Sequence, residues 1–518
     1  MSPRPVSASQ LAPPLGLVLV LATLYRWPAL LNAGAVNSDA AVVGLQARHM
    51  LHGEIAARLW GTDYQGSVDS ALAALSFAIL GARPIALFLV PLVGLLVMVT
   101  LAFDVLRRHL PPWAAAIAVM PLVFAPMASN LPMVYVMRQT LATSLVLGIW
   151  LVESAARAPR RSSRLRFALA GAVLSFGLYI DMFAIVALPA ALLFLLASAF
   201  DPAGERTLAI PARTLGRVGL GLLAAGVAVA ALALLTGIVP PGRVAHNAGL
   251  LFDTCLPFAL GTKVFIKGDE LVAQPWIAPL PVRAIQHAGA TLFAVSLFAA
   301  GPLAFSRRTP WAARRLGLLG LLTILATLAA FLASTKPVDM WSSRYLAPIF
   351  WLSPFTLAPL ASALDPRRLA VIHAPYWAAA LLGGWLSYGP FVDGPLPRVD
   401  PRAAAVEERA LQRELLAAGV HEARAHYWLA YRLTFLFEED PIVAPIDRAD
   451  DRYGPYQQRV DAAPLHALVF HPSEPRATPE PFEADLRARG VAYERRSVAG
   501  FTVLLVRRQA LARDARDV

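Results

Sequence analysis

The stretch LAPPLGLVLVLATLYRWPALLNAGAVNSDAAVVGLQARHM, residues 11–50, decides the class of fold. Its first half is an apolar run of about 20 residues, which is the length that an α-helix needs to cross a bilayer. The run is soon followed by Asp39, which opens a second stretch with a helical pattern. A carboxylate just after such an apolar segment is therefore the first feature to explain.

The composition of the whole chain continues this apolar character. The 518 residues are 57% hydrophobic and only 15% charged, whereas soluble domains average about 25% charged residues. Apolar runs of roughly 18 or more residues recur up to about position 390 and predict a polytopic α-helical membrane protein. The net charge of +12 does not indicate nucleic-acid binding, because the arginines gather in short loops between these runs. A single cysteine, Cys255, excludes an intrachain disulfide.

The distribution of arginine predicts the topology, because loops rich in Lys and Arg stay in the cytoplasm. The segments ARAPRRSSRLR (156–166) and SRRTPWAARR (306–315) are therefore expected on the cytoplasmic side. Alternation along the chain predicts about eleven spans, a cytoplasmic amino terminus and an extracytoplasmic carboxyl terminus. The expected location is a bacterial inner (plasma) membrane. The spans are expected near residues 11–31, 83–104, 113–128, 138–155, 167–180, 182–200, 218–238, 286–305, 316–334, 345–363 and 369–388.

The sequence after residue 388 changes character and predicts a small extracytoplasmic α/β domain over residues 389–518, after a membrane module over residues 1–388. Amphipathic patterns predict two helices, and short apolar runs predict strands and a terminal hairpin. These segments are a helix at 401–419, the strands PIVAPI and LHALVF, the helix PFEADLRARG, and the hairpin strands VAYERR and GFTVLLVRR. The chain contains no glycine-rich phosphate loop and no His/Cys set at metal-binding spacing.

The first outer loop, residues 32–82, is too long for a simple connector. It contains two short helical runs, 39–52 and 67–80, which we expect to lie at the membrane interface. Between them lies WGTDYQGSVDS, residues 60–70, which combines turn residues, aromatic residues and two acids.

This loop resembles the opening of polytopic glycosyltransferases of the GT-C fold, such as protein O-mannosyltransferases and the aminoarabinose transferases of lipid A (glycosyltransferase family 39-like). The similar segments are SDAAVVGLQARHMLHGE, WGTDYQGSVDSALAALSFAILG and ARPIALFLVPL, with SSRYLAPIF at 342–350 and HYWLAYRLTFL at 426–436. The sequence departs from the relatives at Ala40, where they often have a second acid.

The resemblance implies transfer of a sugar from a polyprenyl-phosphate donor to an acceptor hydroxyl at the outer face of the membrane, with inversion. Asp39 is then the general base, because a hydroxyl is a weak nucleophile until its proton is taken. The lipid tail of the donor keeps its phosphate at the interface, and a carboxylate just beyond a span end is at the same depth. Capping of the helix by Ser38 or Asp39 is the alternative explanation, and capping and catalysis are compatible.

The resemblance also implies substrate contacts elsewhere. Asp69 stands in the first turn of its helix, where the helix dipole favours an acid, and it matches an acid of the relatives. Tyr64 and Gln65 are candidate contacts in the same loop, although an exposed loop also explains Tyr64. Asp181 lies between two apolar runs, where acids are often functional, and a solvated turn explains it equally well.

The donor phosphate needs cations, and Arg344 is the first candidate because a guanidinium matches phosphate oxygens bidentately. The alternative is an interfacial anchor formed by Arg344 with Tyr345 and Trp341. Lys336 is the next candidate, since the lysines of the chain all fall in predicted outer loops.

We expect no cofactor and no metal ligands, because a lipid-phosphate donor requires no nucleotide site; one divalent cation shared by Asp39 and the substrate stays an alternative. The expected partners are the polyprenyl-phosphate-linked sugar, the lipid bilayer and an acceptor glycan, lipid or protein, but no nucleic acid. Two other functions stay open: a transporter or flippase of a lipid-linked saccharide, and a non-catalytic GT-C relative, which the substitution at Ala40 prompts. A flippase is expected to show charges deep within spans or broken helices in two matching halves, and the sequence shows neither.

Overall fold

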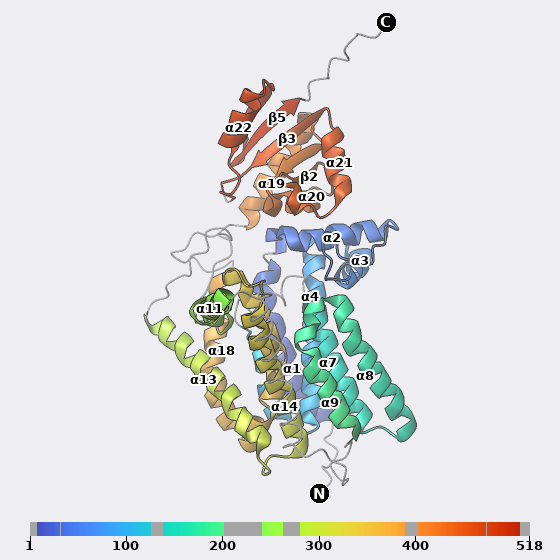
Figure 1. Cartoon of the computed structure of the whole chain (residues 1–518), viewed down its shortest axis with the longest axis vertical. Coiled ribbons are helices and arrows are strands. Elements are labelled where there is room, and N and C mark those ends of the chain that lie inside the picture. Colours follow the sequence, from blue (N-terminus) through green and yellow to red (C-terminus); the bar gives the residue numbers. More distant parts are fainter. Residues whose placement is uncertain are drawn as a thin grey trace. The chain divides into compact units, whose positions relative to one another are not determined.

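A computed structural model describes residues 8–31, 33–125, 138–200, 241–262, 280–388, 401–472 and 474–507. The chain divides into two compact units (Figure 1). The first comprises Met1–Leu30, Phe88–Phe265 and Gln274–Val392, and the second comprises Leu31–Leu87, Ile266–Ala273 and Asp393–Val518.

The first unit is helical. In the described part of the chain, five helices are long and apolar enough to cross a membrane, which makes this an integral membrane protein. They are α4 (Pro84–Arg107), α7 (Gln139–Ala156), α8 (Arg160–Ile180), α13 (Leu280–Phe305) and α14 (Trp311–Ala333). The other helices of this unit are α1 (Ala8–Leu31), α5 (Pro112–Val123), η2 (Met182–Val186), α9 (Leu188–Phe200), α11 (Pro241–Leu250), η3 (Leu251–Cys255), α12 (Leu256–Ala259), η4 (Met340–Leu346), α15 (Ala347–Trp351), α16 (Ser353–Thr356), α17 (Ala358–Ala363) and α18 (Pro366–Tyr388).

The segment expected as one span at residues 345–363 is bent rather than a single straight helix. The helical stretches Met340–Trp351 and Ser353–Ala363 meet at an angle of 46°. A proline stands at the first or second position of α15, α16 and α17. Proline fits the first turn of a helix but cannot donate a backbone hydrogen bond, so each one starts a new short helix.

The remaining expected spans correspond to helices in most places. Helices occupy the segments expected at 11–31, 83–104, 138–155 and 369–388, whereas the segment at 182–200 begins as the separate turn η2. The span expected at 218–238 lies outside the described residues. The total of about eleven spans and the orientation of the termini stay predictions.

The second unit contains a five-stranded mixed sheet with the order β2-β1-β3-β5-β4. The strands β1, β2 and β3 are parallel to one another, while β5 runs antiparallel to β3 and β4. The strands are β1 (Glu422–Ala425), β2 (Ile442–Pro445), β3 (Leu465–Phe470), β4 (Tyr493–Val498) and β5 (Phe501–Arg507). The helices of this unit are η1 (Ala33–Ala35), α2 (Ser38–Leu51), α3 (Val68–Leu80), α19 (Pro401–Ala417), α20 (Tyr427–Leu436), η5 (Arg448–Asp450), α21 (Gly454–Ala462) and α22 (Pro479–Ala488).

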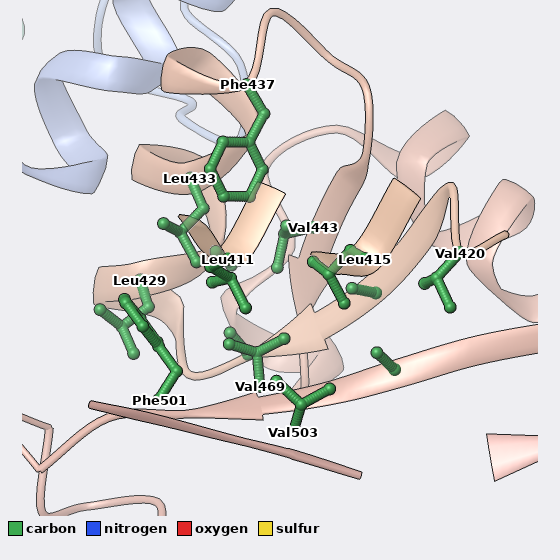
Figure 2. Close-up of a cluster of buried hydrophobic side chains, with 14 of the residues drawn as sticks. Leu411, Leu415, Val420, Leu429, Leu433, Phe437, Val443, Val469, Phe501 and Val503 are labelled. Atoms are coloured by element: carbon green, nitrogen blue, oxygen red, sulfur yellow. The ribbon is translucent and has the colours of Figure 1, made fainter. Parts of the chain in front are cut away.

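The sheet is covered on both faces because successive side chains of a strand point to opposite sides. Val503 and Leu505 of β5 pack with α19 and α20 in one cluster, which Figure 2 shows. Leu504 and Val506 pack on the other face with Leu486 of α22. The expected strands PIVAPI and LHALVF and the terminal hairpin are all present. The interior strand β1 was not predicted, because its sequence EARA offers only two small buried side chains.

The two helices of the first loop belong to this second unit rather than standing alone. α2 packs against both α3 and α20. The approach of α2 to α20 is close: a Cβ atom at Gly44 would lie 2.7 Å from Cε2 of Phe435. The first loop and the carboxyl-terminal segment thus form one structural body, although hundreds of residues separate them in the chain.

Candidate functional site

Asp39 lies in the first turn of α2 but does not cap it. The cap is Asn37, whose side-chain oxygen accepts a hydrogen bond from the backbone N–H of Ala40 at 2.9 Å. The capping explanation for Ser38 and Asp39 was therefore wrong, since both side chains are engaged elsewhere. An acid in the first turn is also favoured by the helix dipole.

The carboxylate of Asp39 is held by a residue of the carboxyl-terminal segment. The hydroxyl of Tyr427, at the start of α20, donates a hydrogen bond to Oδ1 of Asp39. The hydroxyl of Ser38 in turn donates to the backbone carbonyl of Tyr427 at 2.6 Å. Asp39 is partly exposed, and no other hydrogen bond to its carboxylate is formed by the residues that the structure describes. Its second oxygen therefore stays available to an incoming group.

Arg452 completes this group of side chains. Its guanidinium lies 5.3 Å from the centre of the Tyr427 ring, and one of its nitrogens donates to the carbonyl of Gly61 at 2.7 Å. Burial, followed by the charge of Asp39, raises the pKa of Tyr427, so that its hydroxyl stays a neutral donor. Burial alone would lower the pKa of Arg452, but Tyr427 and Asp39 raise it above its ordinary value.

The other predicted residues of the first loop lie in the same unit. Gln65 and Asp69 are buried, whereas Tyr64 is about half exposed and contributes to the electrostatics at Arg452. The backbone N–H of Leu59 donates to the carbonyl of Gln65 at 3.1 Å, which folds the loop back on itself. Asp69 stands in the first turn of α3, as expected.

A second polar cluster joins the first loop to the carboxyl-terminal segment, and the sequence did not point to it. His49 binds the carboxylate of Glu54 through Nδ1 at 2.6 Å and that of Glu439 through Nε2 at 2.8 Å. The hydroxyl of Tyr453 also donates to Glu54, at 2.8 Å. The ring of Tyr453 stacks on Trp60 with a centroid distance of 3.9 Å.

Asp181 lies in the first unit and is not in a solvated turn. It is only 1% exposed, and its carboxylate forms an ion pair with Nε of Arg138 at 2.9 Å. The guanidinium of Arg138 also lies 5.4 Å from the centre of the Tyr345 ring. The structure thus brings two predicted residues, Asp181 and Tyr345, to the same buried arginine.

Of the predicted phosphate ligands, Arg344 lies within η4 and Lys336 precedes it. Both are exposed, and Arg344 lies 5.3 Å from the centre of the Tyr345 ring. The capping box formed by Asp339 and Ser342 fixes the start of this helical turn. Lys263 and Lys267 lie outside the described residues.

Three important residues were missed from the sequence: Tyr427, Arg452 and Arg138. Tyr427 lies within HYWLAYRLTFL, so the resemblance marked its segment but not its role. Arg452 and Arg138 carry no recognisable local signal, because each acquires its partner only through packing. In the described part of the chain, no group of three or more His, Cys, Asp or Glu residues is arranged to hold a metal ion.

Comparison with known proteins gives matches of two kinds. Residues 67–226 match the family model described as dolichyl-phosphate-mannose-protein mannosyltransferase. The crystal structure of ArnT from Cupriavidus metallidurans in the apo state is 14% identical, with a TM-score of 0.55 over 95% of this chain and 98% of that chain. The structure of the same protein bound to undecaprenyl phosphate is 12% identical, with a TM-score of 0.54 and the same coverage. No curated protein sequence matches the chain.

The chain therefore has the fold of ArnT along nearly its whole length. Together, the fold and the family model support a GT-C membrane glycosyltransferase, the class to which the first loop showed a resemblance.

Proposed function

We propose that this protein transfers a sugar from a polyprenyl-phosphate donor to an acceptor hydroxyl at the outer face of a bacterial plasma membrane, with inversion. The observation that carries the proposal is the hydrogen bonding of the Asp39 carboxylate. One carboxylate oxygen is held by Tyr427, while no described residue hydrogen-bonds the other. The ArnT structure with undecaprenyl phosphate supports a donor of this class.

The reaction follows from this arrangement. The acceptor oxygen attacks the anomeric carbon of the sugar, and the bond between that carbon and the phosphate oxygen breaks. Asp39 takes the proton of the hydroxyl as the new bond forms, and the polyprenyl phosphate leaves with the bonding electron pair. Attack from the side opposite the leaving phosphate inverts the configuration at the anomeric carbon.

The leaving phosphate gains negative charge and needs cationic partners. We assign this task to Arg344, with Lys336 and Tyr345 beside it in the chain. Arg344 and Lys336 are exposed and so accessible to a lipid headgroup, and η4 gives Arg344 a defined backbone position. Asp69, Gln65, Tyr64 and Asp181 remain candidate substrate contacts.

The test compares two substitutions in purified protein in lipid nanodiscs. The probes are undecaprenyl-phosphate-linked mannose, glucose and aminoarabinose, each carrying a label on the sugar, with native membranes as the source of acceptor. Asp39→Asn preserves shape but removes the base, so turnover should fall by roughly 10²–10⁴ while donor binding is kept. Arg344→Ala should weaken binding of undecaprenyl phosphate, and Arg344→Lys should weaken it less, because charge is kept but the bidentate fork is lost.

The competing functions predict different outcomes. A folded Asp39→Asn variant that transfers sugar at the wild-type rate would reject Asp39 as the base. Movement of the labelled lipid across the bilayer without any transfer of label would instead favour a flippase. A wild-type protein that binds undecaprenyl phosphate but performs neither process would fit the non-catalytic relative.

A further inference from the structure

Tyr427 lies 388 positions from Asp39 in the sequence, yet the two side chains are in direct contact. Tyr427 is the first residue of α20, and Asp39 is the second residue of α2. The two helices pack against each other within the same unit. The contact therefore depends on the carboxyl-terminal segment and cannot be formed by the first loop alone.

The contact has two points of attachment. The hydroxyl of Tyr427 donates to Oδ1 of Asp39, and the hydroxyl of Ser38 donates to the backbone carbonyl of Tyr427 at 2.6 Å. The side chain and the backbone of one tyrosine are thus both tied to the start of α2. Such a pair of bonds restricts rotation of the Asp39 carboxylate and determines which oxygen is presented to a substrate.

Arg452 holds the tyrosine from its other side. Its guanidinium lies 5.3 Å from the Tyr427 ring centre and is itself anchored on the carbonyl of Gly61. The backbone N–H of Arg452 donates to the hydroxyl of Tyr431 at 2.6 Å. The tyrosine that holds Asp39 is thus part of a supported network rather than a mobile surface side chain.

We propose that Tyr427 is a positioning residue, which orients the carboxylate of Asp39 so that its second oxygen meets the acceptor hydroxyl. This inference rests on the proposed function of Asp39 as general base. It gives the carboxyl-terminal segment a part in the reaction, because α20 supplies the group that holds the base in place. Tyr427 itself exchanges no proton with the substrate.

Removing the hydroxyl should have two consequences. The carboxylate becomes free to rotate, and a small misplacement of a reacting group can cost about 10²-fold in rate. The carboxylate also loses the hydrogen bond that holds one of its oxygens. Turnover should therefore fall.

The experiment compares Tyr427→Phe with Tyr453→Phe in the full-length protein, with the labelled donors described above. Tyr453 offers a matched control, because its hydroxyl also donates to a carboxylate between the first loop and the carboxyl-terminal segment, that of Glu54, without touching Asp39. Tyr427→Phe should lower kcat about 10- to 100-fold with KM nearly unchanged. Tyr453→Phe should leave kcat nearly unchanged.

A double variant separates this inference from the proposed function. If Tyr427 acts through Asp39, adding Tyr427→Phe to Asp39→Asn should cause no further loss of kcat. A Tyr427→Phe variant with wild-type kcat, beside an inactive Asp39→Asn, would overturn the positioning role alone. Equal losses of kcat in Tyr427→Phe and Tyr453→Phe would also overturn the positioning role. They would show a general effect of weakened packing between the first loop and the carboxyl-terminal segment. An active Asp39→Asn variant would overturn the proposed function and the role of Tyr427 with it.

Discussion

His49, in its protonated form, links two distant segments of the chain. Both of its ring nitrogens lie within hydrogen-bond distance of carboxylates, those of Glu54 and Glu439. A neutral imidazole has only one N–H donor, so the arrangement requires the imidazolium. The hydrogen bond with Glu439, followed by that with Glu54, raises the pKa of His49 against the opposing effect of burial.

The residue Glu439 is placed for this contact at a conformational cost. It has φ 67°, a backbone conformation that side chains other than glycine seldom adopt. Although burial alone would raise the pKa of Glu439, its hydrogen bonds with His49 and Tyr456 lower it. The charged pair thus offsets the cost of an unfavourable backbone conformation.

The first prediction concerns the pH dependence of this contact. Because the pKa of His49 is raised in the folded state, its stabilising effect is complete below about pH 6.5, the ordinary value, and is lost as the pH rises through the higher folded value. The melting temperature of the wild type should therefore fall as the pH rises above 6.5. In His49→Gln this fall should be smaller. Identical profiles of melting temperature against pH for the two proteins, measured by thermal unfolding in detergent, would contradict a protonated His49.

The carboxylates set the lower limit of this pH range. The pKa of Glu54 is lowered, first by its hydrogen bond with His49, and the pKa of Glu439 is lowered as well. Stability that depends on a depressed carboxyl pKa is present above its ordinary value and is lost as the pH falls through the folded value. The contact should thus be strongest between the two ranges, at mildly acidic to neutral pH.

At the scale of elements, the hairpin-like loop between α2 and α3 is held against the segment that precedes α21. Gly61 has φ 65°, and a Cβ atom there would lie 2.8 Å from the Cα atom of Arg452. Only glycine satisfies both the backbone conformation and the close approach. The loop can therefore reach Arg452, whose side chain in turn supports Tyr427.

Substitution of Gly61 should measure this approach. Gly61→Ala adds a close contact with the backbone of Arg452 to the cost of a left-handed conformation. Gly53→Ala is the matched control, because Gly53 has φ 92° but no atom within 4 Å of an added Cβ. We expect Gly53→Ala to cost ~1–2 kcal/mol and Gly61→Ala to cost a further ~1–3 kcal/mol in the free energy of unfolding. If denaturant titrations gave equal losses in the free energy of unfolding for the two variants, the loop would not rest against Arg452.

At the scale of the whole molecule, the chain folds back so that its first loop and its last segment share one unit. These two parts must then occupy the same side of the membrane. The arginine-rich loops place that side outside the cytoplasm, which stays a prediction from the positive-inside rule. The shared unit requires the same side for the first loop and the tail, and the arginine pattern alone predicts which side that is.

A reporter experiment tests this orientation. Alkaline phosphatase fused after residue 400 should be active, because the enzyme folds only outside the cytoplasm. A fusion within ARAPRRSSRLR, residues 156–166, should be inactive and serves as the control. An inactive phosphatase together with an active cytoplasmic reporter after residue 400 would contradict the topology and the position of the site.

Much of the fold could be predicted because its causes are local. Long apolar runs predict membrane helices wherever they occur, since an unbroken helix satisfies its own backbone hydrogen bonds. Short apolar runs predicted β2, β3 and the hairpin of β4 with β5. The sequence did not predict the bend at α15–α17, where prolines interrupt an apolar run, or the strand β1, whose small side chains give no pattern of their own.

The features of the candidate site also divide into those with local causes and those that depend on packing. The sequence by itself determined that this is a membrane protein with an acid, Asp39, at the start of a helix in a long loop. Only the tertiary structure decided what holds that acid, because the hydroxyl of Tyr427 binds the carboxylate. The physical reason is distance along the chain. A pattern of hydrophobic residues acts over a few turns, whereas a hydrogen bond between α2 and α20 exists only after two distant segments have packed together.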